Sequence, residues 1–349
     1  MGSSGRRGGR LSPAAIAGWA GLAVVLVGAF LAALGALNQT LYGASSFVER
    51  YFEAIANDDL ITASSTPGVQ LDAAELEAAG LPADVSTAMM RSGVIASAPE
   101  DVRILSDVTE DDGSHTVSVS YRLDTAIVES SFRVSPIAPL YGVLNRWEFA
   151  TSPLAIIDVT AAHNPLFTVG TLSLDTRATK SGDELTAFSQ TAPYLAIAPA
   201  VYEFHYDSTL LEATHVTAGV EPGSHTAVTV DALPTDTFVQ RVQTKVDEFL
   251  SETCASQAVL QPAGCPFGVE LDDRVLSDPT WRIDASPQVT LVPGESSFEM
   301  PPTDGVAHIT VELQSLFDGT VYTYEEDVVF TLALDASVRP DGSISIQLK

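Results

Sequence analysis

Histidine and aspartate side chains give this chain its first candidate chemistry, a metal site on a predicted strand. His205 and Asp207 lie two residues apart, so they would share one face of that strand, and His215 could supply a third ligand. None of the six histidines forms an HExxH motif or a spaced pair with cysteine. We expect His115 and His308, which follow Asp-Gly pairs, to begin strands. The sequence therefore favours no metal site and no cofactor, with this His-Asp-His group as the alternative.

A second group of carboxylates, DVTEDDG at 107–113, has the composition of a calcium loop. Its register is wrong for an EF-hand, because Gly113 at the sixth loop position places Val108 at the first, where a carboxylate is needed. An Asp-Gly pair beside an alternating apolar segment is typical of a hairpin turn. We therefore expect a solvated turn here.

The chain has two cysteines, Cys254 and Cys265, in the segment ETCASQAVLQPAGCPFG. A metal site would need two further ligands, and no histidine is near them in sequence. Outside the cytoplasm, two thiols that close a short loop containing Pro and Gly are best explained as one disulfide. Such a loop would stabilise the fold by about 3 kcal/mol in the chain-entropy model.

The charge balance bears on the class of ligand. The chain carries 17 Lys and Arg against 45 Asp and Glu, a formal net charge of −28. Because such a surface repels phosphate backbones, we do not expect a nucleic-acid partner. The chain also lacks GxSxG, GxGxxG and P-loop motifs, so triad hydrolases and nucleotide-binding enzymes have no support. We predict no catalytic residue.

One segment is long and apolar enough to cross a membrane. Residues 14–37 run for 24 positions without a charge, enough to span a hydrocarbon core of about 30 Å. We predict a cytoplasmic basic tail (1–12) and a transmembrane helix (13–37). Arg6, Arg7 and Arg10 precede the helix and the following chain is acidic, so the positive-inside rule places the C-terminal bulk outside the cytoplasm. A signal peptide cleaved near 42–44 is the alternative, although the apolar run exceeds the usual signal core. No cysteine adjoins the run, which excludes lipid attachment there.

Two pentapeptides of similar sequence, SFVER at 46–50 and TFVQR at 237–241, each predict the start of a helix. In each, a hydroxyl residue is followed three positions later by Glu or Gln, the pattern of a capping box. We place these boxes at Ser46 with Glu49 and at Thr237 with Gln240. Apolar residues then recur at helical spacing, so each helix has one face to bury.

The segments after the two helices are also alike. Each contains a short apolar segment, an Asp-Gly turn (111–115 and 304–308) and an alternating strand. We therefore predict an α+β fold with two units of helix and antiparallel sheet, at 38–160 and 234–349, the second containing the disulfide. In residues 161–233, apolar and polar residues alternate without a helical pattern, which predicts a small β-sandwich spacer.

A helix packed on a curved antiparallel sheet resembles the NTF2-like and cystatin-like class. The order of one N-terminal span, one such unit, a β-sandwich with a Pro-x-x-Tyr segment (Pro199 to Tyr202) and a second unit also resembles membrane-anchored surface proteins of Gram-positive bacteria. These include proteins associated with teicoplanin resistance, which usually begin with a cytoplasmic zinc ribbon that this chain lacks. In some NTF2-like proteins a conical pocket holds an Asp/Tyr/His set, which would here be Tyr51, Asp158 and His163.

We therefore expect a single-pass cell-membrane protein with a cytoplasmic N-terminus. Its extracytoplasmic part would bind or support other components of the bacterial cell envelope without catalysis. The alternative is an NTF2-like small-ligand carrier or enzyme with a conical pocket in one α+β unit. An envelope protein is the candidate partner besides the membrane.

Overall fold

The computed structural model describes residues 13–78, 80–81, 85–179, 188–339 and 341–349. The fold is mixed α+β, with 45% of residues in strands and 23% in helices. Two compact units make up the chain. Unit 1 contains Met1–Ile157, Tyr194–Tyr202 and Ala218–Thr226, and unit 2 contains Asp158–Pro193, Glu203–Thr217 and Ala227–Lys349.

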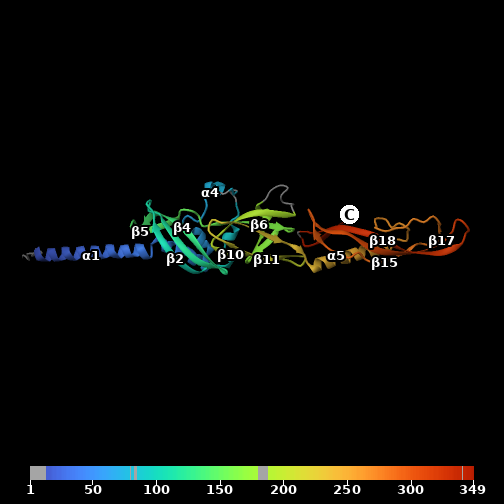
Figure 1. The fold of residues 1–349 in the computed structure, drawn as a ribbon, viewed down its shortest axis with the longest axis horizontal. Helices are drawn as coiled ribbons and strands as arrows, with labels where there is room; N and C mark the ends of the chain where they lie inside the picture. The colour runs from blue at the N-terminus through green and yellow to red at the C-terminus, as the bar shows by residue number, and fades with distance from the viewer. Residues whose placement is uncertain (1–12, 79, 82–84, 180–187, 340) are drawn as a thin grey trace, which may run out of the picture. The chain divides into compact units, whose positions relative to one another are not determined.

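Helix α1 (Pro13–Thr40) begins unit 1 and is the blue helix of Figure 1. Its segment Ala17–Thr40 has the length and composition to cross a membrane, and no residue of its most apolar window is buried within the protein. The helix continues beyond the predicted end at residue 37.

Unit 1 packs helix α2 (Ala44–Ala56) on a four-stranded antiparallel sheet in the order β2-β3-β4-β5. The strands are β2 (Glu100–Thr109), β3 (His115–Leu123), β4 (Ala126–Leu140) and β5 (Leu144–Phe149). Along β3, buried residues alternate with partly exposed ones, because one face of the sheet is covered.

Aromatic side chains fill the space between α2 and this sheet. The rings of Phe47 and Tyr51 lie 5.0 and 5.1 Å from that of Phe149, and Phe52 lies 5.4 Å from Tyr121. Tilted and edge-on pairs at these distances contribute beyond the area they bury. The interior of this helix-on-sheet arrangement is thus filled by side chains.

Three short elements follow α2 in unit 1. They are α3 (Leu60–Ser65), α4 (Ala73–Ala78) and a 3-10 turn, η1 (Ala88–Met90). Asp59 caps α3 by accepting a hydrogen bond of 3.1 Å from the Thr62 amide. Strand β1 (Ile95–Ser97) then pairs with Val201 and Tyr202 of β10.

The middle of the chain consists mainly of strands. Five of them divide their residues between the two units: β6 (Ala155–Ala162), β9 (Ser189–Ala196), β10 (Ala200–Asp207), β11 (Leu211–Val220) and β12 (His225–Asp231). Unit 2 alone contains β7 (Leu166–Val169), β8 (Leu172–Asp175), the turn η2 (Thr176–Thr179) and β13 (Leu233–Pro234). Within unit 2, β7 pairs with β8 and with the second half of β10.

The C-terminal part of unit 2 combines helix α5 (Asp236–Glu248) with an antiparallel sheet. The helix continues as a π-helical turn, Phe249–Cys254, and Cys254 forms a disulfide with Cys265. The sheet has the order β14-β17-β18-β19, with β15 and β16 also paired to β17. Its strands are β14 (Arg274–Val275), β15 (Thr280–Ala285), β16 (Val292–Pro293), β17 (Phe298–Gln314), β18 (Val321–Val338) and β19 (Ile344–Leu348).

One hydrophobic core joins this helix and sheet. Phe238, Val242 and Val246 of α5 are buried in the same cluster as alternate residues of β17 and β18. The buried strand residues include Ile309, Val311, Leu313, Phe330, Leu332 and Leu334. The period of two along the strands and the helical period along α5 each leave one apolar face for this core.

Both predicted capping boxes are wrong. Helix α2 already begins at Ala44, and the Ser46 hydroxyl donates to the Thr40 carbonyl, so it is not available as a cap. Helix α5 begins at Asp236, because Thr235 offers a hydroxyl that accepts from the Phe238 amide at 3.2 Å. Both helices exist, and each starts earlier than predicted.

The predicted turn at 304–308 is also wrong. Asp304 and Gly305 lie inside β17, opposite Thr331 and Phe330 of β18. A Cβ atom at Gly305 would lie 2.5 Å from the Phe330 ring, so close packing explains this glycine. His308 consequently lies within β17. The turn after residue 110 is present, and His115 begins β3 as predicted.

Candidate anion-binding pocket

Strands β10 and β11 bring His205, Asp207 and His215 together in unit 2. Asp207 Oδ2 lies 3.7 Å from His205 Nε2 and 4.0 Å from His215 Nε2, distances of ion pairs rather than hydrogen bonds. The two rings stack at 4.5 Å with an angle of 10° between their planes. A metal ion binds imidazole nitrogen in the plane of the ring, and two nearly parallel planes do not converge on one point. The group is close but is not arranged as a metal centre.

The carboxylates at 107–113 are occupied by protein donors. Asp107 accepts from the Ser45 hydroxyl at 2.6 Å and lies 2.5 Å from His115 Nδ1. Asp112 accepts from the Ser114 amide at 2.9 Å and from Arg133 at 2.6 Å. Partial burial favours a higher pKa for Asp107, but the hydrogen bonds from Ser45 and His115 outweigh it and lower the pKa. These contacts support a hairpin turn with its flanking strands.

The set of Tyr51, Asp158 and His163 is divided between the units. Tyr51 belongs to unit 1, where its buried hydroxyl donates to the Ala198 carbonyl at 2.7 Å. Burial raises the pKa of Tyr51 well above its usual value. Asp158 and His163 belong to unit 2. Tyr51 is therefore a core residue with a satisfied hydroxyl.

The sheet of unit 2 assembles a group that the sequence did not indicate. Asp284, His308 and Asp327, from β15, β17 and β18, offer ligand atoms within 4.8 Å of one another. Arg282 already donates to both Asp284 oxygens, at 2.6 and 3.1 Å, and His308 Nδ1 lies 2.6 Å from Asp327. A cation would have to displace Arg282, so we interpret this group as an ion-pair network.

A pocket of about 600 Å³ in unit 2 has the most distinctive chemistry. Eighteen described residues line it; three are arginines, Arg177, Arg241 and Arg339, and none of the eighteen is acidic. In the whole chain 45 of 349 residues are acidic, so an average set of eighteen would contain about two. The charged side chains that line the pocket are thus basic, in a chain whose net charge is negative.

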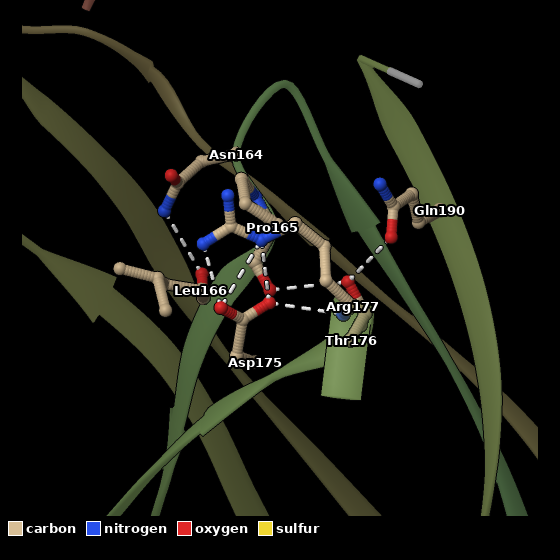
Figure 2. Close-up of polar contacts among 7 residues, drawn as sticks. All are labelled: Asn164, Pro165, Leu166, Asp175, Thr176, Arg177 and Gln190. Atoms are coloured by element: carbon tan, nitrogen blue, oxygen red, sulfur yellow. Dashed lines mark hydrogen bonds and ion pairs between the residues drawn. The ribbon is translucent and has the colours of Figure 1, made fainter. Parts of the chain in front are cut away.

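Asp175 orients the first of these arginines. Arg177 Nε lies 2.9 Å from Asp175 Oδ1, and Nη2 lies 2.6 Å from Oδ2, a two-point contact shown in Figure 2. Hydrogen bonds from Arg177 lower the pKa of Asp175, while partial burial opposes this effect. About a third of each side chain remains exposed, 36% for Arg177 and 32% for Asp175. The guanidinium is therefore held in one orientation at the pocket.

A buried polar network holds the backbone beside Arg177 (Figure 2). The Thr176 amide donates to the Pro165 carbonyl at 3.0 Å, and Thr176 Oγ1 lies 3.1 Å from the same oxygen. Thr176 Oγ1 also lies 3.3 Å from Gln190 Oε1. Thr176 and Gln190 are buried, and satisfied buried polar groups fix local structure. Pro165 itself lines the pocket, so this network joins the residue before Arg177 to the residue before β7.

The other two arginines come from distant parts of the sequence. Arg241 projects from the first half of α5, and Arg339 follows the last residue of β18. Arg339 donates to the Ser345 hydroxyl at 3.1 Å. Because this hydroxyl is neutral, the contact does not compensate the charge of Arg339. Arg241 makes no ion pair within the described part of the chain. Its charge is thus available to a ligand.

His163 adds a fourth nitrogen group to the wall. Its backbone has φ of 63°, a left-handed conformation that costs a non-glycine residue about 1–3 kcal/mol. Nδ1 lies 2.7 Å from Asp231 Oδ1, and the ring lies 5.0 Å from that of Phe188. Asp231 therefore fixes the orientation of the imidazole ring through Nδ1.

Half of the rest of the wall is apolar, seven of the fourteen remaining residues. Leu210, Leu211 and Phe298 are buried in the core of unit 2 and also line the pocket. Pro165, Leu166, Phe188 and Val338 complete this apolar part. Apolar walls with a few placed polar groups are typical of sites for small organic ligands. The pocket is suited to a molecule with an acidic group and an apolar body.

Comparison with protein-family models finds no match for this chain, and comparison with curated proteins finds none either. The pocket is therefore interpreted from its own geometry. Sequence reasoning missed it because Arg177, Arg241 and Arg339 lie in three separate segments and share no motif. The one available signal was the scarcity of arginine, 14 residues in the chain, of which three meet here.

Proposed function

We propose that this chain is a membrane-anchored, extracytoplasmic binding protein of the bacterial cell envelope that holds an organic anion in the unit 2 pocket. One observation carries the binding role: three arginines and no described acidic residue line a pocket in a chain of net charge −28. Clefts lined by one sign of charge raise the local concentration of ligands of the opposite sign.

The anchor part of the proposal depends on α1 and its flanks. The 24 residues of Ala17–Thr40 would extend about 36 Å as a helix, enough for one crossing. Arg6, Arg7 and Arg10 favour a cytoplasmic N-terminus, so both units would lie outside. The Cys254–Cys265 disulfide agrees with an oxidising compartment. The packing of α2 and α5 on antiparallel sheets supports NTF2-like or cystatin-like units, which we retain as part of the proposal.

The ligand class follows from the groups in the wall. A guanidinium presents parallel N–H donors that match carboxylate or phosphate oxygens, and such charge-assisted bonds are among the strongest in proteins. The apolar residues would cover the rest of the molecule. A carboxylate or phosphate ester with an aromatic or aliphatic body meets both requirements.

Isothermal titration of the full chain in nanodiscs tests this proposal. We expect phenyl phosphate to bind and benzyl alcohol, which has a similar apolar body without the charge, to bind much more weakly. Arg241→Met should raise the Kd for phenyl phosphate by about 10- to 150-fold, because one charge-assisted hydrogen bond contributes about 1.5–3 kcal/mol. Arg103→Met is the matched control, since Arg103 is an exposed arginine of β2 in unit 1. Equal binding of benzyl alcohol, or equal loss in the control, would contradict the proposal.

A second candidate function is an enzyme acting on the same ligand class. The His163–Asp231 pair favours it, because a carboxylate that orients one imidazole nitrogen is the usual arrangement of a general base. Ser208 and Ser296 also line the pocket and could act as nucleophiles. Turnover of phenyl phosphate that disappears in His163→Gln, with binding retained, would favour this candidate over simple binding.

A further inference from the structure

The tip of the β4–β5 hairpin in unit 1 exposes apolar side chains. Tyr141 is 87% exposed, Val143 46% and Leu140 38%. Tyr141 has φ of 53° and Gly142 has φ of 74°, so the turn holds an aromatic residue in a left-handed conformation that bulky side chains rarely adopt. A turn that displays Tyr, Val and Leu to the outside suggests a surface with which these side chains make contact.

This tip is attached to the end of α1. Asn38 Nδ2 donates to the Val143 carbonyl at 2.9 Å, and the Asn145 amide donates to Asn38 Oδ1 at 3.0 Å. Trp147 of β5 also donates from Nε1 to the Tyr42 carbonyl, just after the helix, at 2.8 Å. These three bonds fix the hairpin at the level where the apolar run of α1 ends.

The helix end itself continues the exposed apolar surface. Leu37 is 38% exposed and Leu41 59%, on either side of Asn38. If α1 spans the bilayer, Asn38 lies at the outer boundary between hydrocarbon and headgroups, and the hairpin tip lies beside it. Tyrosine is enriched at this depth of membrane proteins, because its ring is apolar and its hydroxyl is polar.

The charge of the hairpin agrees with a lipid surface. Residues 130–147, SSFRVSPIAPLYGVLNRW, contain no Asp or Glu and include Arg133 and Arg146, in a chain with 45 acidic residues. Arg133 pairs with Asp112, whereas Arg146 is exposed in β5, close to the tip. Basic residues beside a membrane are attracted to anionic headgroups.

We propose that the β4–β5 tip, residues 140–143, inserts into the outer face of the membrane that α1 crosses and so docks unit 1 on the bilayer. The inference rests on the anchor in the proposed function and is independent of the ligand pocket. Its physical basis is the burial of Leu140, Tyr141 and Val143 among lipid headgroups and upper acyl chains.

Site-specific fluorescence in liposomes tests the inference. The described part of the chain has no free cysteine, so Tyr141→Cys introduces one labelling site in the full chain. An NBD label there is read in liposomes of phosphatidylcholine and phosphatidylglycerol, with lipids that carry a nitroxide quencher near the headgroup. Val143→Cys gives a second probe of the tip. Ile127→Cys is the control, because Ile127 is 77% exposed and lies at the other end of the 15-residue strand β4, about 45 Å away.

We expect blue-shifted emission and nitroxide quenching at positions 141 and 143 and neither at 127. Water-like emission at 141, with the protein retained in liposomes after a carbonate wash, would overturn the docking and leave the anchor intact. Blue-shifted emission without quenching would also overturn it, since the tip would then be covered by protein, for example by a second copy. Loss of the protein from the liposomes would overturn both the anchor and the docking.

Discussion

Arg177 and Asp175 form a two-point ion pair at the unit 2 pocket, with Nε 2.9 Å from Oδ1 and Nη2 2.6 Å from Oδ2. Arg282 and Asp284 repeat this arrangement on the sheet of the same unit, at 2.6 and 3.1 Å. Of these four residues, only Arg177 lines the pocket. Substitutions in the two pairs therefore separate the effect on ligand binding of a place at the pocket from the effect of losing an ion pair.

Arg177→Lys should weaken phenyl phosphate binding about tenfold, although it keeps the positive charge. Lysine is a point charge and cannot donate to Asp175 and to a ligand oxygen in the fixed geometry of a guanidinium. The loss corresponds to about 1.4 kcal/mol, one charge-assisted hydrogen bond. Isothermal titration in nanodiscs measures it.

Arg282→Lys is the matched control for this experiment. It removes the same kind of ion pair from the same unit, away from the pocket, so the Kd should not change. A similar loss in both variants would indicate a general effect on unit 2, and unchanged binding in Arg177→Lys would remove Arg177 from the site.

Asp175→Asn tests the ion pair through pH. Since hydrogen bonds from Arg177 lower the pKa of Asp175 in the folded chain, the carboxylate stabilises the fold above its unfolded pKa of about 3.9. This contribution is lost as pH falls through the lower folded pKa. The urea midpoint of Asp175→Asn should therefore lie below that of the unchanged chain from neutral pH to about pH 5, and the difference should shrink in stronger acid. A difference that widens in acid would show that Asp175 has a raised pKa.

The disulfide should contribute about 3 kcal/mol to the free energy of unfolding. It links residues 11 positions apart, and closing a loop of this size restricts the unfolded chain. Reductant should lower the urea midpoint of the unchanged chain but leave the double variant Cys254→Ala, Cys265→Ala unaffected. An equal fall of the urea midpoint in both proteins would show that the reductant does not act through this disulfide. Because Cys254 is buried in the unit 2 core, the double variant also reports the loss of core packing.

The helices and strands were largely predictable because their signals are local. The spacing of Phe47, Tyr51 and Phe52 indicates one apolar helical face, and the structure buries that face. The start of α5 was missed because Thr235 and Thr237 offer the same cap chemistry two residues apart, and sequence alone does not choose between them. The NTF2-like likeness of the two units remains a prediction.

The pocket could not be predicted by the same means. Arg177 follows a short strand, Arg241 lies on a helix and Arg339 follows a long strand, so their presence in one pocket depends on how β8, α5 and β18 pack. Arg241 and Arg339 are exposed and Arg177 is partly buried, and none of them alone marks a binding site. A motif search detects neighbours in sequence, whereas this site depends on distant segments that meet in space.

Gly305 shows why one turn was predicted wrongly. The Asp-Gly pair indicated a hairpin, but Gly305 lies within β17, where an added Cβ would be 2.5 Å from Phe330 Cζ and 2.8 Å from Pro287 Cδ. Gly305→Ala should therefore destabilise unit 2 by about 1–3 kcal/mol, the usual cost of overpacking a core.

Gly219→Ala is the control for this substitution. Gly219 lies in strand β11, and a Cβ there would meet Leu123 at 3.5 Å, an ordinary contact. Alanine at this position should be neutral or slightly stabilising, because it reduces the freedom of the unfolded chain. Urea unfolding of both variants measures the difference. Equal stability of the two would mean that Phe330 and Pro287 move aside without cost, and the Asp-Gly pair would then need another explanation than close packing.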